Sequence, residues 1–426
     1  RDCMIGSNSA VNIADAYLRG IRGYDVETLY QAVIKNSNKK GPLSSVGRFG
    51  AKHYNTLGYV PYDVGINESA ARTLAYAFAD WSIAELAEAL GKPQEEIDLF
   101  RSRSQNYKNV FDPETQFMRG RFRNTWFAPF NPHEVNFNYT EANAWQYSNY
   151  VPQDFSGYIN LLGSKAQFET NLDTLFLAHP ETTGRKQADI TGLIGQYAHG
   201  NEPSHHMAYL YNFVNKPYKT QEKVHKILTT LYTNSPDGIS GNEDCGQMSA
   251  WYVFSALGFY PVTPASNTYI IGKPLFETAT IHLENQNTFS IKSYDLSAAN
   301  QYIASVKLNG DFLERSFLYH SEIMSGGDLE FFMTNEPSQW ATKKGSEPTT
   351  SIDDFLIVPA PFISEGDIAF KTKTAVSLGN VDPKTTLYFK VDDSNYQTYK
   401  EPIELTEAAT LHVYAEKNKV KSSVIS

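Results

Sequence analysis

Apolar residues recur every three or four positions from about residue 9 to residue 265, which is the pattern of amphipathic helices. The longest such run, residues 68–91, stops at a glycine that is soon followed by proline, a combination typical of helix ends. A second run, residues 93–111, follows at once, so we expect an antiparallel helix pair. We expect further helices at residues 14–24, 26–36, 141–151, 166–178, 203–214, 218–232 and 246–259. The long connections, rich in Gly, Pro and Asn, favour a helical barrel or toroid over a compact bundle, and loops of that length are usually functional.

The period changes after Pro261 from helical to alternating, which predicts β-strands. Strands are expected at residues 267–272, 278–283, 289–294, 302–310, 317–320 and 329–334. The polar stretch 334–354 is interpreted as a linker. Four more strands, at residues 374–379, 386–392, 401–406 and 409–416, predict a small all-β sandwich. Because 426 residues are too many for one ordinary core, we expect two domains, at residues 1–345 and 346–426.

Charge and composition narrow the possible partners. The chain has 37 Lys and Arg against 47 Asp and Glu, a net charge of -10, which argues against binding to nucleic acid or to an anionic membrane surface. No apolar run reaches the length of a membrane span. With Cys3 and Cys245 as the two cysteines, neither a disulfide framework nor a zinc motif is expected. A neutral or cationic ligand fits better, and the 27 Tyr and 25 Phe offer faces for sugar rings, although most aromatics simply fill a core.

Three short stretches combine carboxylates, aromatic residues and the start of a predicted helix: YTEANAWQY (139–147), HGNEPSHHMAY (199–209) and GNEDCGQMSAW (241–251). Each acidic residue has a purely structural interpretation. Asp244 is a good N-cap, Thr140 can cap a helix that contains Glu141, and Glu202 precedes a proline at the first helical position. Any one of these stretches alone is explained by capping.

The combination of the stretches indicates glycosidic hydrolysis, which needs one carboxylic acid and one carboxylate. The acid must stay protonated, which requires desolvation or a like-charged neighbour, whereas a base is best kept ionised at a helix N-terminus. Glu141, close to Trp145 and between two tyrosines, has the apolar setting of the acid. Asp244, in a polar loop beside Glu243, suits the base.

The adjacent histidines His205 and His206 point about 100° apart on a helix, so they cannot ligate one metal together in the way an i, i+4 pair does. One of them can hydrogen-bond a sugar while the other is a core residue. Asn201 and Glu202, together with backbone carbonyls, are better suited to Ca²⁺, which prefers oxygen ligands.

At these stretches the sequence resembles glycoside hydrolase family 92, the exo-acting, calcium-dependent, inverting α-mannosidases. The resemblance covers most of residues 1 to about 345. It includes, in order, MIGSNSAVNIADAYLRG, LGYVPYD, TLAYAFADWSIAELAEALG, RSQNYKNVFDPETQFMRGR, TEANAWQY, HGNEPSHHMAYLYN, GNEDCGQMSAWYVFSALGFYPV and YIASVKLNG. It implies an (α/α)6 barrel as the catalytic region, followed by strands, and an N-terminal β-sandwich that this chain lacks. The tail after about residue 350 lies outside that core and resembles the small sandwich appended to some hexosaminidases.

By this resemblance, Glu141 is the general acid and Asp244 the general base, and Ca²⁺ binds the O2 and O3 hydroxyls of the terminal mannose. The metal role falls on Asn201 and Glu202, and substrate binding on Trp145, His205, His206, Asn242 and Glu243. Relatives that cleave mannose-phosphate diesters lack the acid glutamate, so Glu141 argues for ordinary mannosides.

The chain also departs from the family. A WDTF-like sugar-binding segment is absent, Ala75 stands where many members have Glu, and Asn242 stands where some carry a second acid. The first residues, RDCMIGSNSA, lack the basic and apolar segments of a signal peptide. We therefore expect a missing N-terminal region of the same enzyme to supply a signal for a secreted, periplasmic or cell-surface location. The expected partner is a mannose-containing oligosaccharide or glycoprotein glycan, with α-1,2 linkages favoured. The alternatives are a non-catalytic mannan-binding protein and a glucoside hydrolase on the same barrel.

Overall fold

A computed structural model describes residues 4–38 and 48–426, and Cys3 lies outside them. The chain forms two compact units. Unit 1 comprises residues 1–154, 182–186 and 352–426, and unit 2 comprises residues 155–181 and 187–351. Among the described residues, no helix is long and apolar enough to cross a membrane.

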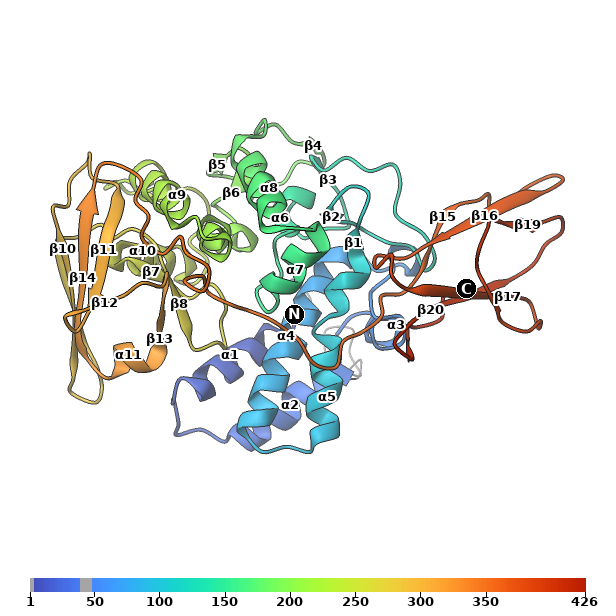
Figure 1. The fold of residues 1–426 in the computed structure, drawn as a ribbon, viewed down its shortest axis with the longest axis horizontal. Coiled ribbons are helices and arrows are strands. Elements are labelled where there is room, and N and C mark those ends of the chain that lie inside the picture. Colours follow the sequence, from blue (N-terminus) through green and yellow to red (C-terminus); the bar gives the residue numbers. More distant parts are fainter. Residues whose placement is uncertain (1–3, 39–47) are drawn as a thin grey trace. The chain divides into compact units, whose positions relative to one another are not determined.

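The helical part of unit 1 is built around α4. Its helices are α1 (Asn8–Leu18), α2 (Val26–Asn38), α3 (Ala51–Leu57), η1 (Tyr62–Val64), α4 (Ser69–Ala89), α5 (Gln94–Arg103), η2 (Asn106–Val110) and α6 (Ala144–Tyr147) (Figure 1). Short strands β1 (Phe111–Asp112), β2 (Phe117–Met118), β3 (Glu134–Val135) and β4 (Thr183–Gly184) form two small ladders. Helices α1 and α5 both pack against α4, which is buried along most of its length. This confirms the predicted long helix and its partner.

The C-terminal part of unit 1 is all-β, as predicted. Its strands are β15 (Phe362–Glu365), β16 (Thr374–Gly379), β17 (Thr386–Val391), β18 (Gln397–Thr398), β19 (Ile403–Leu405), β20 (Leu411–Lys417) and β21 (Val420–Lys421). They form a three-stranded sheet in the order β15-β16-β19 and a four-stranded sheet in the order β18-β17-β20-β21.

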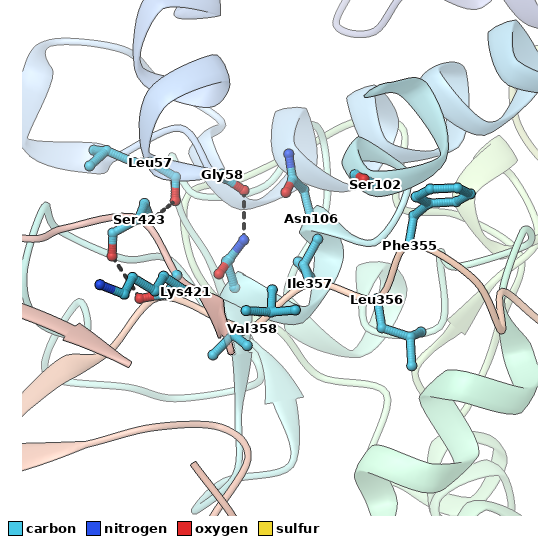
Figure 2. Close-up of a pocket in the computed structure, with 13 residues that line it drawn as sticks. Leu57, Gly58, Ser102, Asn106, Phe355, Leu356, Ile357, Val358, Lys421 and Ser423 are labelled. Atoms are coloured by element: carbon cyan, nitrogen blue, oxygen red, sulfur yellow. Dashed lines mark hydrogen bonds between the residues drawn. The ribbon is translucent and has the colours of Figure 1, made fainter. Parts of the chain in front are cut away.

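This β part contacts the helices of unit 1 through specific bonds. Ser423 Oγ donates to the Leu57 carbonyl at 2.8 Å (Figure 2). The buried Arg121 donates to the carbonyls of Asn109, Ala360 and Pro361. A pocket of about 400 Å³ lies along this seam. The tail is therefore joined to the helical region within one compact unit, and the division of the chain at residue 345 into two domains stays a prediction.

Unit 2 holds the remaining helices and a larger sheet. Its helices are α7 (Phe155–Leu162), α8 (Lys165–Leu177), η3 (Glu202–Ser204), η4 (Met207–Val214), α9 (Pro217–Thr230), α10 (Gln247–Leu257) and α11 (His320–Met324). Its strands are β5 (Leu193–Ile194), β6 (Tyr197–Ala198), β7 (Phe259–Tyr260), β8 (Thr268–Ile271), β9 (Thr278–His282), β10 (Thr288–Tyr294), β11 (Tyr302–Leu308), β12 (Asp311–Phe312), β13 (Phe317–Tyr319) and β14 (Gly327–Thr334).

The main sheet of unit 2 has the order β12-β11-β14-β10-β9, with β10 and β14 parallel (Figure 1). Asn309 and Gly310 both have positive φ in the turn from β11 to β12, which is why an Asn-Gly pair suits this hairpin. The predicted linker 334–354 is wrong in part. Trp340 is only 7% exposed, packs in the core of this sheet and donates from Nε1 to the Leu313 carbonyl at 2.8 Å. Burial of a large apolar ring stabilises the folded state even when its neighbours in the sequence are polar.

Helices followed by strands and an all-β tail agree with the predicted order of elements. The closed (α/α)6 barrel itself stays a prediction.

Candidate active site

Three loops of unit 2 lie side by side and bring polar residues together. Thr191 Oγ1 donates to the Ser240 carbonyl at 3.1 Å, and Gly200 N–H donates to the Thr191 carbonyl at 3.1 Å. A Cβ atom at Gly200 would lie 1.8 Å from Thr191 Oγ1, so only glycine permits this approach. The loops that carry Asn201 and Asp244 are thereby held against each other.

Glu202 and Asp244 meet at this junction through a side-chain hydrogen bond. Burial raises the pKa of Glu202, and the neighbouring carboxylates of Asp244 and Asp189 raise it further. Asn242 Nδ2 donates to Asp189 Oδ1 at 3.1 Å, so a third acidic residue belongs to the cluster. Carboxyl groups in contact do not all stay ionised unless a cation lies between them; otherwise they share a proton.

The turn before α10 corrects the capping prediction. Asp244 makes no cap, because the side chain that accepts from the first helical amides is that of Glu243, bonded to Gly246 N–H and, at 3.2 Å, to Ser249 N–H. A hydrogen bond from the Ser249 side chain, together with those from the Gly246 and Ser249 backbone N–H groups, lowers the pKa of Glu243. Asp244 and Cys245 have φ values of 52° and 56°, in the left-handed region that is costly for residues with a Cβ. The turn thus keeps the Asp244 carboxyl group out of the cap and beside Glu202.

A chain of hydrogen bonds behind this cluster fixes His199. Tyr232 O–H donates to the Met248 carbonyl at 3.1 Å, so the Tyr232 oxygen accepts from His199 Nε2 at 2.7 Å. The other ring nitrogen, Nδ1, then accepts from Tyr197 O–H at 2.8 Å. Burial lowers the pKa of His199 to about 2, and the ring is therefore neutral. This chain ties the segment before Asn201 to helix α10.

His205 is held in the same way. Its Nε2 donates to the His199 carbonyl at 2.9 Å, and its Nδ1 accepts from Gln247 Nε2 at 3.1 Å. Its own carbonyl accepts from Trp251 Nε1 at 2.9 Å. Burial lowers the pKa of His205 to about 4. Both ring nitrogens are used within the protein, so in this arrangement His205 supports the site and offers no polar atom to a sugar.

His206 and Asn201, the other predicted site residues of this segment, are 6% exposed. The His206 ring lies 6.0 Å from that of Phe155. Asn201 is the N-cap of η3, and its Oδ1 accepts from Glu202 N–H at 3.1 Å. Pro203 is the second residue of η3, one position after the first helical position that the sequence predicted for it.

Unit 1 presents Glu141 on a loop anchored to α4. The Asn138 carbonyl accepts from Ala70 N–H and Ala71 N–H at the start of α4, at 3.1 and 3.2 Å. Gly120 packs directly against the Asn138 side chain, since a Cβ atom there would lie 1.9 Å from Asn138 Oδ1. Glu141 follows three residues later and is half-buried.

The helix predicted for residues 141–151 is only the single turn α6, and Thr140 does not cap it. Asn143 is the N-cap and forms a capping box with Gln146, because Glu141 adopts a φ of 52° that no helix accepts. Burial mainly raises the pKa of Tyr147, and the Glu141 charge contributes to that rise; the apolar setting expected for Glu141 stays a prediction.

Trp145 stands on α6, with its ring edge-on to Phe117 at 4.7 Å and near His133 at 5.9 Å. In the part of the chain that the structure describes, its buried Nε1 has no hydrogen-bond partner. A donor of this kind is suited to a hydroxyl of a bound molecule.

The predicted residues fall into two groups. Glu141 and Trp145 belong to unit 1, whereas Asn201, Glu202, His205, His206, Asn242, Glu243 and Asp244 belong to unit 2. Sequence reasoning missed Asp189, His199 and Tyr232. The quoted block HGNEPSHH contains His199, but its role depends on Tyr232, which lies 33 residues away, and Asp189 lies in a loop without any periodic pattern.

The donor atoms around Glu202 bear on the predicted calcium site. Within residues 4–38 and 48–426, no cluster of three or more His, Cys, Asp or Glu suited to a metal occurs. However, Ca²⁺ also accepts amide, carbonyl and water oxygens. The contacting carboxyl groups of Glu202 and Asp244, with Asn201 beside them, supply hard oxygen donors whose mutual repulsion a cation relieves. These residues fit calcium.

Comparisons with known proteins assign this chain to a family. The catalytic-domain model of glycosyl hydrolase family 92 matches residues 1–335, and the chain therefore belongs to that family. It is similar to a family 92 α-mannosidase from Bacteroides thetaiotaomicron in complex with mannoimidazole, with 37% identity, a TM-score of 0.76, and coverage of 82% of this chain and 46% of that one.

Two further relatives were found. A family 92 inverting mannosidase from the same organism is 37% identical, with a TM-score of 0.75 and coverage of 83% of this chain and 49% of that one. An uncharacterized secreted glycosidase of Arthroderma benhamiae is 30% identical over an alignment of 379 residues, with coverage of 80% of this chain and 47% of that one. The chain thus spans about half the length of these relatives.

Proposed function

We propose that this chain carries catalytic residues of an exo-acting, inverting α-mannosidase that removes terminal α-linked mannose. Glu141 donates a proton to the glycosidic oxygen, and Asp244 takes a proton from the attacking water on the opposite face of the sugar. Family membership supports the class of reaction, and the two similar solved structures are both mannosidases.

The observation that carries the proposal is the contact between Glu202 and Asp244. Glu243, and not Asp244, accepts the hydrogen bonds from the backbone N–H groups at the start of α10. The Asp244 carboxyl group is therefore available for chemistry. Glu202 and Asn201, with backbone carbonyls, would hold Ca²⁺ beside it. A calcium ion held there would supply positive charge for binding sugar hydroxyls.

The setting of Glu141 supports the acid role. Glu141 is half-buried, and partial burial is one of the conditions that suit a general acid. Trp145 from the following turn would contact the sugar through its ring and Nε1, with His206 and Asn242 as further contacts and His205 behind them.

The substrates we propose are N-glycans or mannans, with α-1,2 linkages favoured, in a secreted, periplasmic or cell-surface setting. One relative is itself called a secreted glycosidase.

The decisive experiment uses the full-length protein and the α-1,2-, α-1,3-, α-1,4- and α-1,6-linked mannobioses, with the matching glucosides. We expect release of mannose, with the β-anomer appearing first by NMR, and loss of activity with a calcium chelator that added calcium reverses. Turnover of glucosides only would favour a different hydrolase. Binding of mannobiose without any turnover would favour a non-catalytic mannan-binding protein.

Two variants separate chemistry from structure. Asp244→Asn should lower kcat by about 10²-fold or more while the unfolding midpoint stays that of the wild type, because Asp244 caps no helix. Glu243→Gln is the matched control on the neighbouring residue and should affect stability more than kcat. Full activity of Asp244→Asn would refute its role as the base.

A further inference from the structure

Unit 2 contains a pocket of about 530 Å³ beside the turn that carries Asp244. It is formed by the loop that follows α9 and by one face of α10. Two contacts join it to the candidate site: Ser249, which lines the pocket, donates from its backbone N–H to Glu243, and the Tyr232 ring in the wall belongs to the side chain that holds His199. Its volume is within the range of small-ligand sites.

The lining of this pocket is uncharged. Apart from tyrosine, no ionisable side chain is among its lining residues, and Asp237, although it lies in the same loop, is not one of them. Asn234 and the hydroxyl groups of Thr233 and Ser235, which lie 2.9 Å apart, provide hydrogen-bond donors and acceptors. The absence of Lys and Arg argues against a phosphate or carboxylate ligand.

Aromatic rings form part of the wall. Tyr232 and Tyr252 lie with ring centroids 5.0 Å apart and planes at 49°, so they present surfaces at two orientations. Val253 adds apolar area and is 55% exposed. A pyranose has an apolar C–H face and a rim of neutral hydroxyl groups. The tyrosine rings of the pocket suit that face, and the Asn234 amide suits the hydroxyl groups.

We propose that this pocket is an accessory glycan subsite that binds a neutral sugar residue of an α-linked manno-oligosaccharide, at a position other than the mannose that is cleaved. The inference rests on the proposed function, because the substrate class comes from it. The subsite makes the protein prefer long chains over single mannosides, and Tyr252 and Val253 determine that preference.

The test compares a one-sugar substrate with a longer one on the full-length protein. The variants are Val253→Asp, which places a charge in the neutral wall, and Tyr252→Ala, which removes a ring. Leu177→Asp is the matched control, since Leu177 is 80% exposed on α8 and does not line the pocket. Unfolding midpoints equal to that of the wild type establish that the variants fold.

For α-linked mannotetraose, both pocket variants should raise KM about tenfold. For an aryl α-mannoside, KM and kcat should stay within about twofold of the wild type, as for the control. An unchanged KM for mannotetraose, or an equal change for both substrates, would overturn the subsite.

Failure of the proposed function is separable from failure of the subsite. If the wild-type protein cleaves no mannoside, the function proposal fails, and binding of mannotetraose is then measured by saturation-transfer NMR. Transfer that is present in the wild type and lost in Val253→Asp supports the subsite, whereas equal transfer in both refutes it.

Discussion

Breaking the buried ion pair of Arg48 and Asp80 tests how strongly it stabilises α4, the helix to which the Glu141 loop is anchored. Arg48 Nη2 lies 2.6 Å from Asp80 Oδ1, and neither side chain is exposed to solvent. Tyr54 O–H also donates to Asp80, at 3.0 Å. Asp80 lies on α4, whose first amides bind the Asn138 carbonyl close to Glu141.

Replacing Asp80 by Asn keeps the size of the side chain and an acceptor for Tyr54 but leaves the Arg48 guanidinium buried without a counter-charge. Removal of one partner of such a pair costs about 3–5 kcal/mol. Arg48→Met should cost a similar amount for the same reason. The double variant should cost less than the sum of the two by about 2 kcal/mol or more, because no lone charge remains.

The assay is urea denaturation followed by circular dichroism, with the transition of each unit fitted separately. The control is Arg123→Met, which removes an exposed ion pair with Asp63 at 2.9 Å and should cost less than about 1 kcal/mol. An Asp80→Asn variant as stable as the control, or single losses that simply add, would refute the reasoning.

Three further predictions concern single side chains. Tyr232→Phe should lower kcat several-fold and raise the calcium concentration needed for activity. Tyr209→Phe, which also loses one buried hydroxyl hydrogen bond, should change neither quantity. Equal calcium titrations of the two variants would contradict a role of Tyr232 in positioning the site. Gly120→Ala should lower both the unfolding midpoint and kcat in the full-length protein, because its methyl group would displace Asn138; a wild-type thermal melt and rate would show that the contact is dispensable. Lys273 is buried, and burial lowers its pKa to about 8. The charged ammonium group is therefore less stable in the folded state than in the unfolded state. The free energy of unfolding should rise as the pH increases from about 8 towards the pKa of an unfolded lysine, near 10.5. Lys273→Met should therefore stabilise the protein at pH 7 and less at pH 10, and thermal melts at both values measure this.

The sequence predicted the larger elements well because their signals are local. The run of residues 68–91 gave α4 almost to its ends, since a periodic apolar pattern and a terminal glycine act over a few turns. The turn at Asn309 and Gly310 depends on an equally local feature, because its two positive φ values favour those residues. The Trp340 segment was interpreted as a linker because its polar neighbours hide one anchoring ring, and burial of that ring depends on a core formed by distant strands.

The site was harder to predict, because its contacts join residues that are far apart in the sequence. The motifs identified Glu202 and Asp244, but the contact between their carboxyl groups is a tertiary feature. The structure also changes how the motif GNEDCG is interpreted. A capping assignment by position selects Asp244, whereas the left-handed φ values of Asp244 and Cys245 turn the chain so that only the longer Glu243 side chain reaches the helix amides. Two adjacent carboxylates thus have separate tasks, which no rule of spacing distinguishes. For that reason, Glu243→Gln and Asp244→Asn should differ in kind, one acting mainly on stability and the other on turnover, and similar phenotypes would show that the turn has been assigned wrongly.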